Sequence, residues 1–363
     1  MHRRVLLSNG WSTKALLQTM LSLTISLFYT AHHIHAAPLP WTKAKQPSSG
    51  APKSIGGYAN GCLQGAAKLP ERGVGYRSIR RHRNRYYAHP VTIRVLEEIA
   101  RELKVKGFED LEIGDLSQPR GGRMKYGHRS HQSGLDIDVW FGGSKSYLSK
   151  EHKRRARRVK AKAKKKKWSK KKLKSALFDV DHPSAVKGRR EVIDQRVWSK
   201  RHEQLLKVAA SQDEVARIFV HFRIKEKMCE LYREERAERG SQESKSGVDA
   251  PLWLRKLRPW YGHHQHFHIR LHCPEGSTEC DPQGPLPKGL GCDNLAWFSR
   301  IEKRKRRDEA KAASEAEELR RAKLPQSELR ALKREEAKKR NETKKVAKEK
   351  RERLIKRCEH LSP

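Results

Sequence analysis

The segment at residues 262–272 most constrains what this chain can fold into. It reads GHHQHFHIRLH, and its second half alternates polar with apolar residues. Because successive side chains of a strand point to opposite faces, His266 and His268 share one face while the apolar residues between them face a core. A loop at His263 and His264 can bend either ring toward the same point. The pattern predicts a half-buried strand that carries a candidate metal site.

The carboxylate that such a histidine site needs lies upstream. Residues 135–139 read LDIDV, which predicts a second half-buried strand with Asp136 and Asp138 on its polar face. Gly134 permits a turn just before this strand, so that His131 can fold back beside Asp138. Two imidazoles and one carboxylate are ligand types of catalytic Zn²⁺, which leaves the fourth position to water. Asp136 is then placed to accept a hydrogen bond from a ligand imidazole.

The charge of the chain indicates basic additions to an ordinary domain. The 363 residues include 82 Lys and Arg against 42 Asp and Glu, a formal net charge of +40, and only 36% are hydrophobic. This length allows one large domain or two small ones. A single core cannot use that much charge, so we expect an anionic partner such as nucleic acid, an acidic membrane surface or an acidic polymer.

The N-terminus has the features of an export signal. Arg3 and Arg4 begin a basic leader, an apolar run follows at residues 16–29, and a small residue suited to cleavage stands at Ala36. The pattern predicts a signal peptide over residues 1–36. The apolar run is short and polar for a membrane span, so we expect no transmembrane span after signal removal; an uncleaved anchor is the alternative. The arginine pair is a weak feature of twin-arginine export.

The cysteines agree with an exported protein. Their even number favours disulfides in an oxidising compartment, and the lack of any Cys-x-x-Cys pair argues against a zinc ribbon. Six cysteines allow fifteen pairings, and only Cys273 and Cys280, which flank a turn-rich hexapeptide, predict a local pair. Disulfide formation after export favours the general secretion route. The six are Cys62, Cys229, Cys273, Cys280, Cys292 and Cys358.

Composition divides the chain into three parts after the signal. We expect a globular domain over residues 37–298 with a Lys/Arg-rich insert at about 145–176. Sixteen of residues 150–174 are Lys or Arg, which is typical of a solvated segment, helical or disordered. Residues 299–363 are charged, with many opposite charges four residues apart, and Pro325 divides them into two predicted helices.

Periodicity predicts three further elements in the globular part. Residues 91–107 have apolar residues at helical spacing and end at a glycine suited to cap a helix. A second helix is expected at about residues 201–210, followed by a turn and a strand at residues 216–222.

The two histidine motifs also resemble a known family. SHQSGLDID (130–138) has the pattern Ser-His-x-x-Gly-x-x-x-Asp, and HFH (266–268) has the pattern His-x-His. Together they resemble the LAS group of zinc peptidases, and within it most closely the penicillin-insensitive murein endopeptidases. The resemblance extends over SIGGYANGCLQGAAKLP (54–70), RNRYYAHP (83–90), GGRMKYGHRSHQSGLDIDV (121–139), ARIFVHFRIKEKMC (216–229) and WLRKLRPWYGHHQHFHIRLHCP (253–274).

This resemblance implies a role for each histidine of the two motifs. The implied Zn²⁺ ligands are His131, Asp138 and His268. His266 would lie beside the metal as a base or transition-state stabiliser, and His263 and His128 match two further active-site histidines of the family. His264 and His272 have no counterpart in the pattern.

The resemblance also implies the fold, the substrate and the disulfides. The fold would be α+β, with a LAS/Hedgehog-like antiparallel sheet that carries the zinc site and is flanked by helices. The substrate would be the D-alanyl–meso-diaminopimelyl cross-link of peptidoglycan, cut in the periplasm of a Gram-negative-type envelope. Independently of the resemblance, Arg123 is a candidate to bind a substrate carboxylate because it lies near the site in sequence. The implied disulfides are Cys62–Cys358, Cys229–Cys292 and Cys273–Cys280.

Two other classes of protein compete with this interpretation. Ser184-Ala-Val-Lys187 and Lys245-Ser-Gly247 match two of the three motifs of penicillin-binding peptidases, but no Ser-x-Asn occurs in the sequence. The alternative without catalysis is a basic secreted protein that binds cell wall, lipopolysaccharide or nucleic acid through the Lys/Arg-rich insert. The insert has Trp168 as its lone aromatic residue, so it offers little base stacking and no dedicated nucleic-acid motif.

Overall fold

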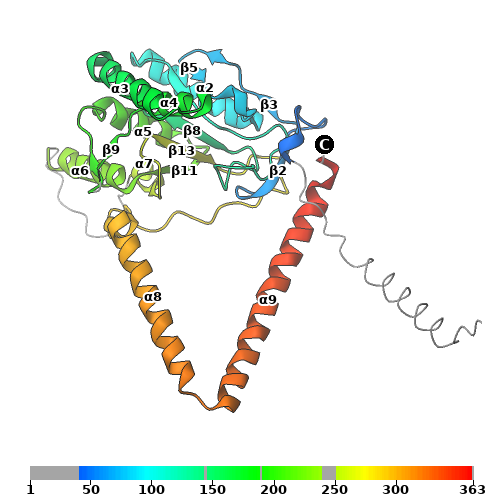
Figure 1. Ribbon diagram of the computed structural model, residues 1–363. Helices are drawn as coiled ribbons and strands as arrows, with labels where there is room; N and C mark the ends of the chain where they lie inside the picture. The colour runs from blue at the N-terminus through cyan, green and yellow to red at the C-terminus, as the bar shows by residue number, and fades with distance from the viewer. Residues whose placement is uncertain (1–40, 143–144, 189, 239–250, 362–363) are drawn as a thin grey trace, which may run out of the picture. The chain divides into compact units, whose positions relative to one another are not determined.

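The structure is a computed structural model that describes residues 41–142, 145–188, 190–238 and 251–361 (Figure 1). The predicted signal peptide, residues 1–36, lies outside the described residues, as does Lys245-Ser-Gly247. None of the helices that are described is both long enough and apolar enough to cross a membrane.

A seven-stranded mixed sheet forms the centre of the fold. Neighbouring strands are antiparallel except in the pairs β11–β12 and β5–β7, so the expectation of an α+β fold with a mainly antiparallel sheet is confirmed. In order across the sheet the strands are β12 (Leu257–Pro259), β11 (Val215–Val220), β13 (His266–Leu271), β8 (Asp136–Trp140), β7 (Leu111–Ile113), β5 (Tyr76–Ser78) and β4 (Arg72–Gly73).

Three two-stranded ladders and a set of helices complete the described chain. The ladders are β1 (Lys53–Gly57) with β2 (Asn60–Gln64), β3 (Ala67–Lys68) with β6 (Tyr87–Ala88), and β9 (Val186–Lys187) with β10 (Val192–Ile193). The α-helices are α2 (Pro90–Val105), α3 (Lys145–Lys165), α4 (Lys170–Asp181), α5 (Lys200–Ser211), α6 (Phe222–Glu238), α7 (Leu252–Lys256), α8 (Arg300–Ala322) and α9 (Gln326–Cys358).

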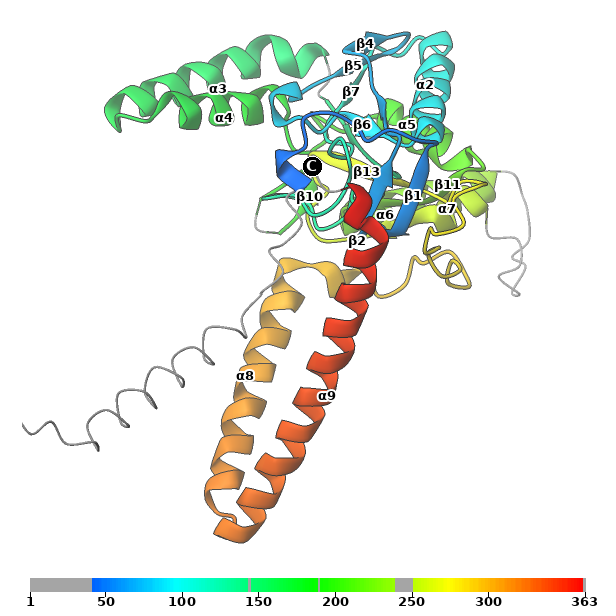
Figure 2. The ribbon, with the colours of Figure 1, turned by 90° about the vertical axis from the view of Figure 1, so that its right-hand side faces the viewer.

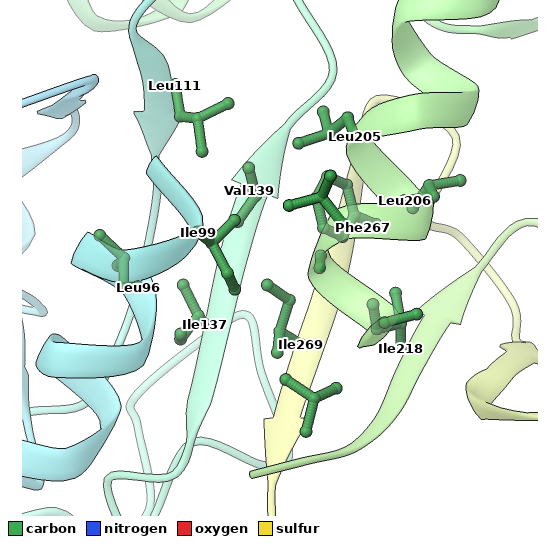
Figure 3. Close-up of a cluster of buried hydrophobic side chains, with 14 of the residues drawn as sticks. Leu96, Ile99, Leu111, Ile137, Val139, Leu205, Leu206, Ile218, Phe267 and Ile269 are labelled. Atoms are coloured by element: carbon green, nitrogen blue, oxygen red, sulfur yellow. The ribbon is translucent and has the colours of Figure 1, made fainter. Parts of the chain in front are cut away.

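The two alternating segments form the adjacent central strands β8 and β13. They pair antiparallel, with Ile137 opposite Ile269 and Asp138 opposite His268. The apolar residues of both strands are buried in one core cluster with α2 and α5, from which Leu96 and Leu205 approach the sheet (Figure 3). The period of two therefore separates an apolar face on the core from a polar face that is free to carry a site.

Both helices that periodicity predicts in the globular part are present, as α2 and α5, and one predicted strand end is wrong. Helix α2 ends at Val105, and Gly107 takes the left-handed conformation expected after a helix end (φ 77°). The strand predicted at residues 216–222 stops at Val220. His221 instead caps the unpredicted helix α6, because its Nδ1 accepts from the backbone N–H of Arg223 at 3.2 Å.

The Lys/Arg-rich insert is helical. Helices α3 and α4 lie side by side, joined by residues 166–169 (Figure 2). Ser169 caps α4, since its side chain accepts from the backbone N–H of Lys172 at 3.3 Å. Of the two alternatives for this segment, the structure has the helical one.

The charged C-terminal residues form α8 and α9, which meet at Pro325 as predicted (Figure 1). Arg321 of α8 forms ion pairs with Glu317 and with Glu336 of α9. The far end of α9 is attached to β2 by the disulfide Cys62–Cys358. The other two disulfides are Cys229–Cys292 and Cys273–Cys280, so the structure contains the three pairs that the family resemblance implies.

The first prediction concerns this attachment. A single proteolytic cut at residues 323–325 separates α9 from the preceding chain, but the Cys62–Cys358 bond should keep the fragment attached. We expect the nicked protein to run as one species without reductant and as two with it. A Cys358→Ser variant should release the fragment in both conditions. Release from the wild type without reductant would contradict the linkage.

Candidate metal centre

One buried carboxylate, Asp138, is the point on which four imidazoles converge. Its Oδ1 lies 3.3 Å from His131 Nε2 and 3.6 Å from His268 Nδ1. Its Oδ2 lies 3.2 Å from His128 Nε2, and His266 Nε2 is 3.8 Å from Oδ1. The histidines of the two sequence motifs, far apart along the chain, are thus brought together by the pairing of β8 with β13.

A tight turn places His131 in this cluster. His131 has a left-handed backbone (φ 67°), and its N–H donates to Asp136 Oδ2 at 2.7 Å. Gly134, also left-handed (φ 77°), lets the turn pack closely against β2, since a Cβ at this position would lie 2.5 Å from Leu63 Cδ2. The side chain of His131 is fully buried, as the predicted fold-back beside Asp138 requires.

Asp136 orients His268 from the opposite side. Its Oδ1 accepts from His268 Nε2 at 2.8 Å and from Arg270 Nε at 2.8 Å. Burial raises the pKa of Asp136, but the charges of Arg270 and His268 outweigh it and lower the pKa overall. An ionised carboxylate only accepts, so the proton of His268 is on Nε2 and the lone pair of Nδ1 faces Asp138. The predicted role of Asp136 as an acceptor for a site histidine is confirmed in geometry.

Several buried atoms of the cluster are left for a further partner. Both ring nitrogens of His131 and Oδ1 of Asp138 are buried without a hydrogen-bond partner among the described residues; the 3.3 Å approach between them does not have hydrogen-bond geometry. Buried polar atoms are rarely left unpaired. His128, His131 and Asp138 offer ligand atoms within 4.8 Å of one another. This donor set fits a metal ion.

The protonation states favour metal binding as well. Burial lowers the pKa of His268 to about 4 and also lowers the pKa values of His263 and His266. Burial raises the pKa of Asp138, but His128 and His131 outweigh it and bring the pKa well below its usual value. Neutral imidazoles beside an ionised carboxylate are the forms that coordinate metals.

His128 differs from the other histidines because it lies between two carboxylates. Its Nε2 is 3.1 Å from Asp115 Oδ2 and 3.2 Å from Asp138 Oδ2. Burial lowers the pKa of His128, but the charges of Asp138 and Asp115 raise it overall. Asp115 in turn accepts from Arg83 at 2.7 Å and Arg85 at 2.9 Å. His128 is therefore the histidine of this cluster best suited to carry a proton.

The sequence did not identify Asp115. Burial raises its pKa, but the hydrogen bond from His128 and the charge of Arg83 lower it to about 2. Its position directly after Gly114 and strand β7 was the one available indication. Neither arginine partner is near it in the sequence, so the network needed the fold to be recognised.

Of the remaining residues that the sequence indicated, His263 belongs to the cluster, whereas His264, His272 and Arg123 do not. Its backbone is left-handed (φ 52°), and its ring centroid lies 5.3 Å from that of His266. His264 turns away, with Nδ1 3.0 Å from Ser184 Oγ. His272 and Arg123 are exposed.

Aromatic side chains next to the cluster include one from helix α4, which follows the Lys/Arg-rich helix α3. Trp140, on the same face of β8 as Asp138, lies 5.2 Å from the ring of His266 and 5.0 Å from that of Phe178 on α4. The Arg80 guanidinium lies 3.8 Å from the centre of the Phe178 ring. Trp140 and α4 also line a cavity of about 810 Å³. Helix α4 is thus packed against Trp140, next to the candidate metal centre.

An α+β fold whose mainly antiparallel sheet carries a histidine–aspartate centre defines the class of this protein as a candidate metalloenzyme. Residues 54–333 match the family model described as penicillin-insensitive murein endopeptidase. A penicillin-insensitive murein endopeptidase of Haemophilus influenzae is 38% identical over 78% of this chain and 87% of its own length. Those of Klebsiella pneumoniae strain 342 and Yersinia pestis are 36% and 35% identical, each over 72% of this chain and 82% of their own. The chain belongs to the family of penicillin-insensitive murein endopeptidases, a family of peptidases.

The second prediction tests the support that Asp136 gives to the centre. Asp136→Asn removes the charge that orients His268, and such a change beside a ligand typically lowers metal affinity about 10- to 100-fold. Competition against a chromogenic chelator measures that affinity. Thermal unfolding in excess chelator establishes that the variant is folded. Asp213→Asn, in the exposed turn before β11, is the matched control, and equal affinity in both variants would contradict the assignment.

Proposed function

We propose that this chain is an exported zinc endopeptidase that hydrolyses D-alanyl–meso-diaminopimelyl cross-links of peptidoglycan in the periplasm and is insensitive to penicillin. The observation that carries the proposal is a set of buried atoms that have no hydrogen-bond partner among the described residues, namely both ring nitrogens of His131 and Oδ1 of Asp138, next to neutral imidazoles. Family membership and the names of the relatives support the peptidase activity and the murein substrate. The resemblance further supports a LAS/Hedgehog-like fold for the sheet.

The metal ligands in this proposal are His131, Asp138 and His268. His268 has its Nδ1 lone pair directed toward Asp138 while its Nε2 is held by Asp136, and this carboxylate–histidine arrangement is typical of metal ligands. His128 is grouped with His131 and Asp138 by distance, but its Nε2 already lies between two carboxylates. A protonated imidazole cannot bind a metal, so we assign His128 to proton transfer.

The chain's own residues supply the remaining chemistry. Bound zinc lowers the pKa of water to about 7 and polarises a carbonyl. His266, half-buried and neutral, can accept the proton of an attacking water. His128, kept protonated by Asp115 and Asp138, can donate a proton to the leaving amine. His263 lies against His266 and restricts the position of its ring.

The third prediction is the activity itself. Purified sacculi that contain diaminopimelate should release monomeric muropeptides from cross-linked dimers when treated with the zinc-loaded protein. A chelator and the His268→Ala change should each block the conversion, whereas penicillin should not. Penicillin sensitivity without chelator sensitivity would instead favour the serine-type class. Dimers left uncut by zinc-loaded protein would contradict the proposed function.

The fourth prediction separates the two candidate ligand sets. His268→Ala should abolish stoichiometric zinc binding, measured by elemental analysis after dialysis. His128→Ala should retain the metal and lose turnover by about 10²- to 10⁴-fold, as expected for a general acid. Loss of metal in His128→Ala with retention in His268→Ala would show that His128 is the ligand.

The basic helices α3 and α4 favour a second, non-catalytic role. Those of their Lys and Arg side chains that the structure describes are mostly exposed, and the helix pair contacts Trp140 next to the site through Phe178. We propose that this surface also tethers the protein to an anionic polymer such as murein or lipopolysaccharide phosphates.

The fifth prediction tests the tether. Deletion of residues 150–174 should weaken binding to sacculi at low salt and reduce the salt dependence of that binding. A variant with fifteen exposed Lys and Arg residues of α8 and α9 changed to glutamine matches the net charge lost in the deletion, which removes sixteen cations and Glu151, and so controls for net charge. Unchanged binding and salt dependence after the deletion would rule the tether out.

A further inference from the structure

Arg80 differs from two other arginines of the segment to which it belongs. Residues 80–85 lie between β5 and β6, and Arg83 and Arg85 of this segment both donate to Asp115 next to the metal centre. Arg80 forms no hydrogen bond or ion pair with any residue that the structure describes. The residue is partly exposed, so the five N–H donors of its guanidinium are available to a ligand.

Two aromatic rings hold the Arg80 guanidinium in place. Its central carbon lies 3.8 Å from the centre of the Phe178 ring and 4.7 Å from the centre of the Trp140 ring. Contacts of this kind restrain a guanidinium through the ring faces and take up none of its N–H donors. Arg80 is therefore restrained in position and still able to donate hydrogen bonds.

The contact with Trp140 places Arg80 beside the metal centre. Trp140 is opposite His266 in the pairing of β8 with β13, and the two rings lie 5.2 Å apart. Trp140 also follows Asp138 by two residues on the same face of β8, a separation of about 7 Å along a strand. Arg80 thus lies on the side of the centre that Trp140 forms.

The acidic groups near Arg80 have other partners. Burial lowers the pKa of Arg80, and the charge of Arg83 lowers it further, whereas three carboxylates raise it, those of Asp115, Asp179 and Asp138. Asp115 is engaged by two arginines and a histidine, and Asp179 is exposed on α4. Asp138 faces the imidazoles of the centre, and a bound metal ion would offset its charge. The positive charge of Arg80 therefore remains available to an anion.

We propose that Arg80 binds the free carboxylate of the diaminopimelyl residue whose amino group forms the cross-link. The proposal rests on the proposed function, because it assigns a specificity-determining residue to that reaction. This carboxylate is attached to the carbon that bears the scissile nitrogen, so the group that binds it must lie next to the metal centre. Arg80 meets this requirement, and a guanidinium can hold a carboxylate through two parallel hydrogen bonds.

The test compares cross-linked muropeptide dimers in which this carboxylate is free or amidated, cut by the full zinc-loaded protein. The wild type should have a kcat/KM about tenfold higher for the free form, because amidation removes a charge-assisted pair. Arg80→Gln should bring the kcat/KM values for the two forms to within about twofold of each other. Arg80→Lys keeps the charge but loses the parallel hydrogen bonds, so it should restore part of the preference.

Two controls separate a binding role of Arg80 from a structural one. Elemental analysis should find the zinc content of the wild type in Arg80→Gln, because Arg80 is not a proposed ligand. Arg72→Gln removes an exposed charge of β4 and should keep the wild-type preference for the free form. If Arg80 had a structural role alone, Arg80→Gln would lower the activity toward both dimers equally and leave their ratio unchanged.

The outcomes that contradict the proposal are distinct from failure of the proposed function. Equal kcat/KM for both dimers in the wild type, or a preference that survives in Arg80→Gln, overturns the role of Arg80 alone. Loss of the preference in Arg123→Gln with retention in Arg80→Gln would assign the carboxylate to Arg123 instead. A wild-type protein that cuts neither dimer overturns the proposed function and the role of Arg80 with it.

Discussion

The burial of the Asp138 carboxylate is the constraint on which the rest of the site depends. An ionised carboxylate in the interior is costly unless cations or hydrogen bonds compensate it. The fold provides imidazoles from three segments: the turn at His131, the loop at His128, and strand β13 with His268 opposite Asp138. Even so, one oxygen of Asp138 stays without a hydrogen bond among the described residues. A bound divalent cation would compensate the negative charge of this oxygen, which apolar core side chains could not do.

The sheet supports this centre because one strand pairing serves both stability and chemistry. The pairing of β8 with β13 buries Ile137 and Ile269 on one face and aligns Asp138 with His268 on the other. A shift of one residue in register would move the apolar side chains to the site and the site residues to the core. The core therefore fixes the geometry of the centre, and Asp136 refines it by orienting His268.

The sequence predicted those parts of the structure that follow from local periodicity. Alternation in LDIDV and HFHIRL identified both strands and the polar face that carries the site. Partners brought in from elsewhere were missed: Asp115 with its two arginines, and Phe178 against Trp140. The end of β11 was also missed. His221 continues the alternating pattern of the strand in the sequence, but in the structure its ring caps helix α6. The Lys/Arg-rich insert was ambiguous, since its composition suits a helix and a solvated coil equally.

The position of a bound zinc ion would test the proposed ligand set of His131, Asp138 and His268 directly. Crystals of the mature protein loaded with zinc would be measured on both sides of the zinc absorption edge, and the anomalous difference map would locate the ion. We expect one peak about 2.0–2.2 Å from a His131 nitrogen and an Asp138 oxygen, with His268 Nδ1 as the third protein ligand. A peak coordinated elsewhere, or none at Asp138 in protein that cuts murein cross-links, would contradict it.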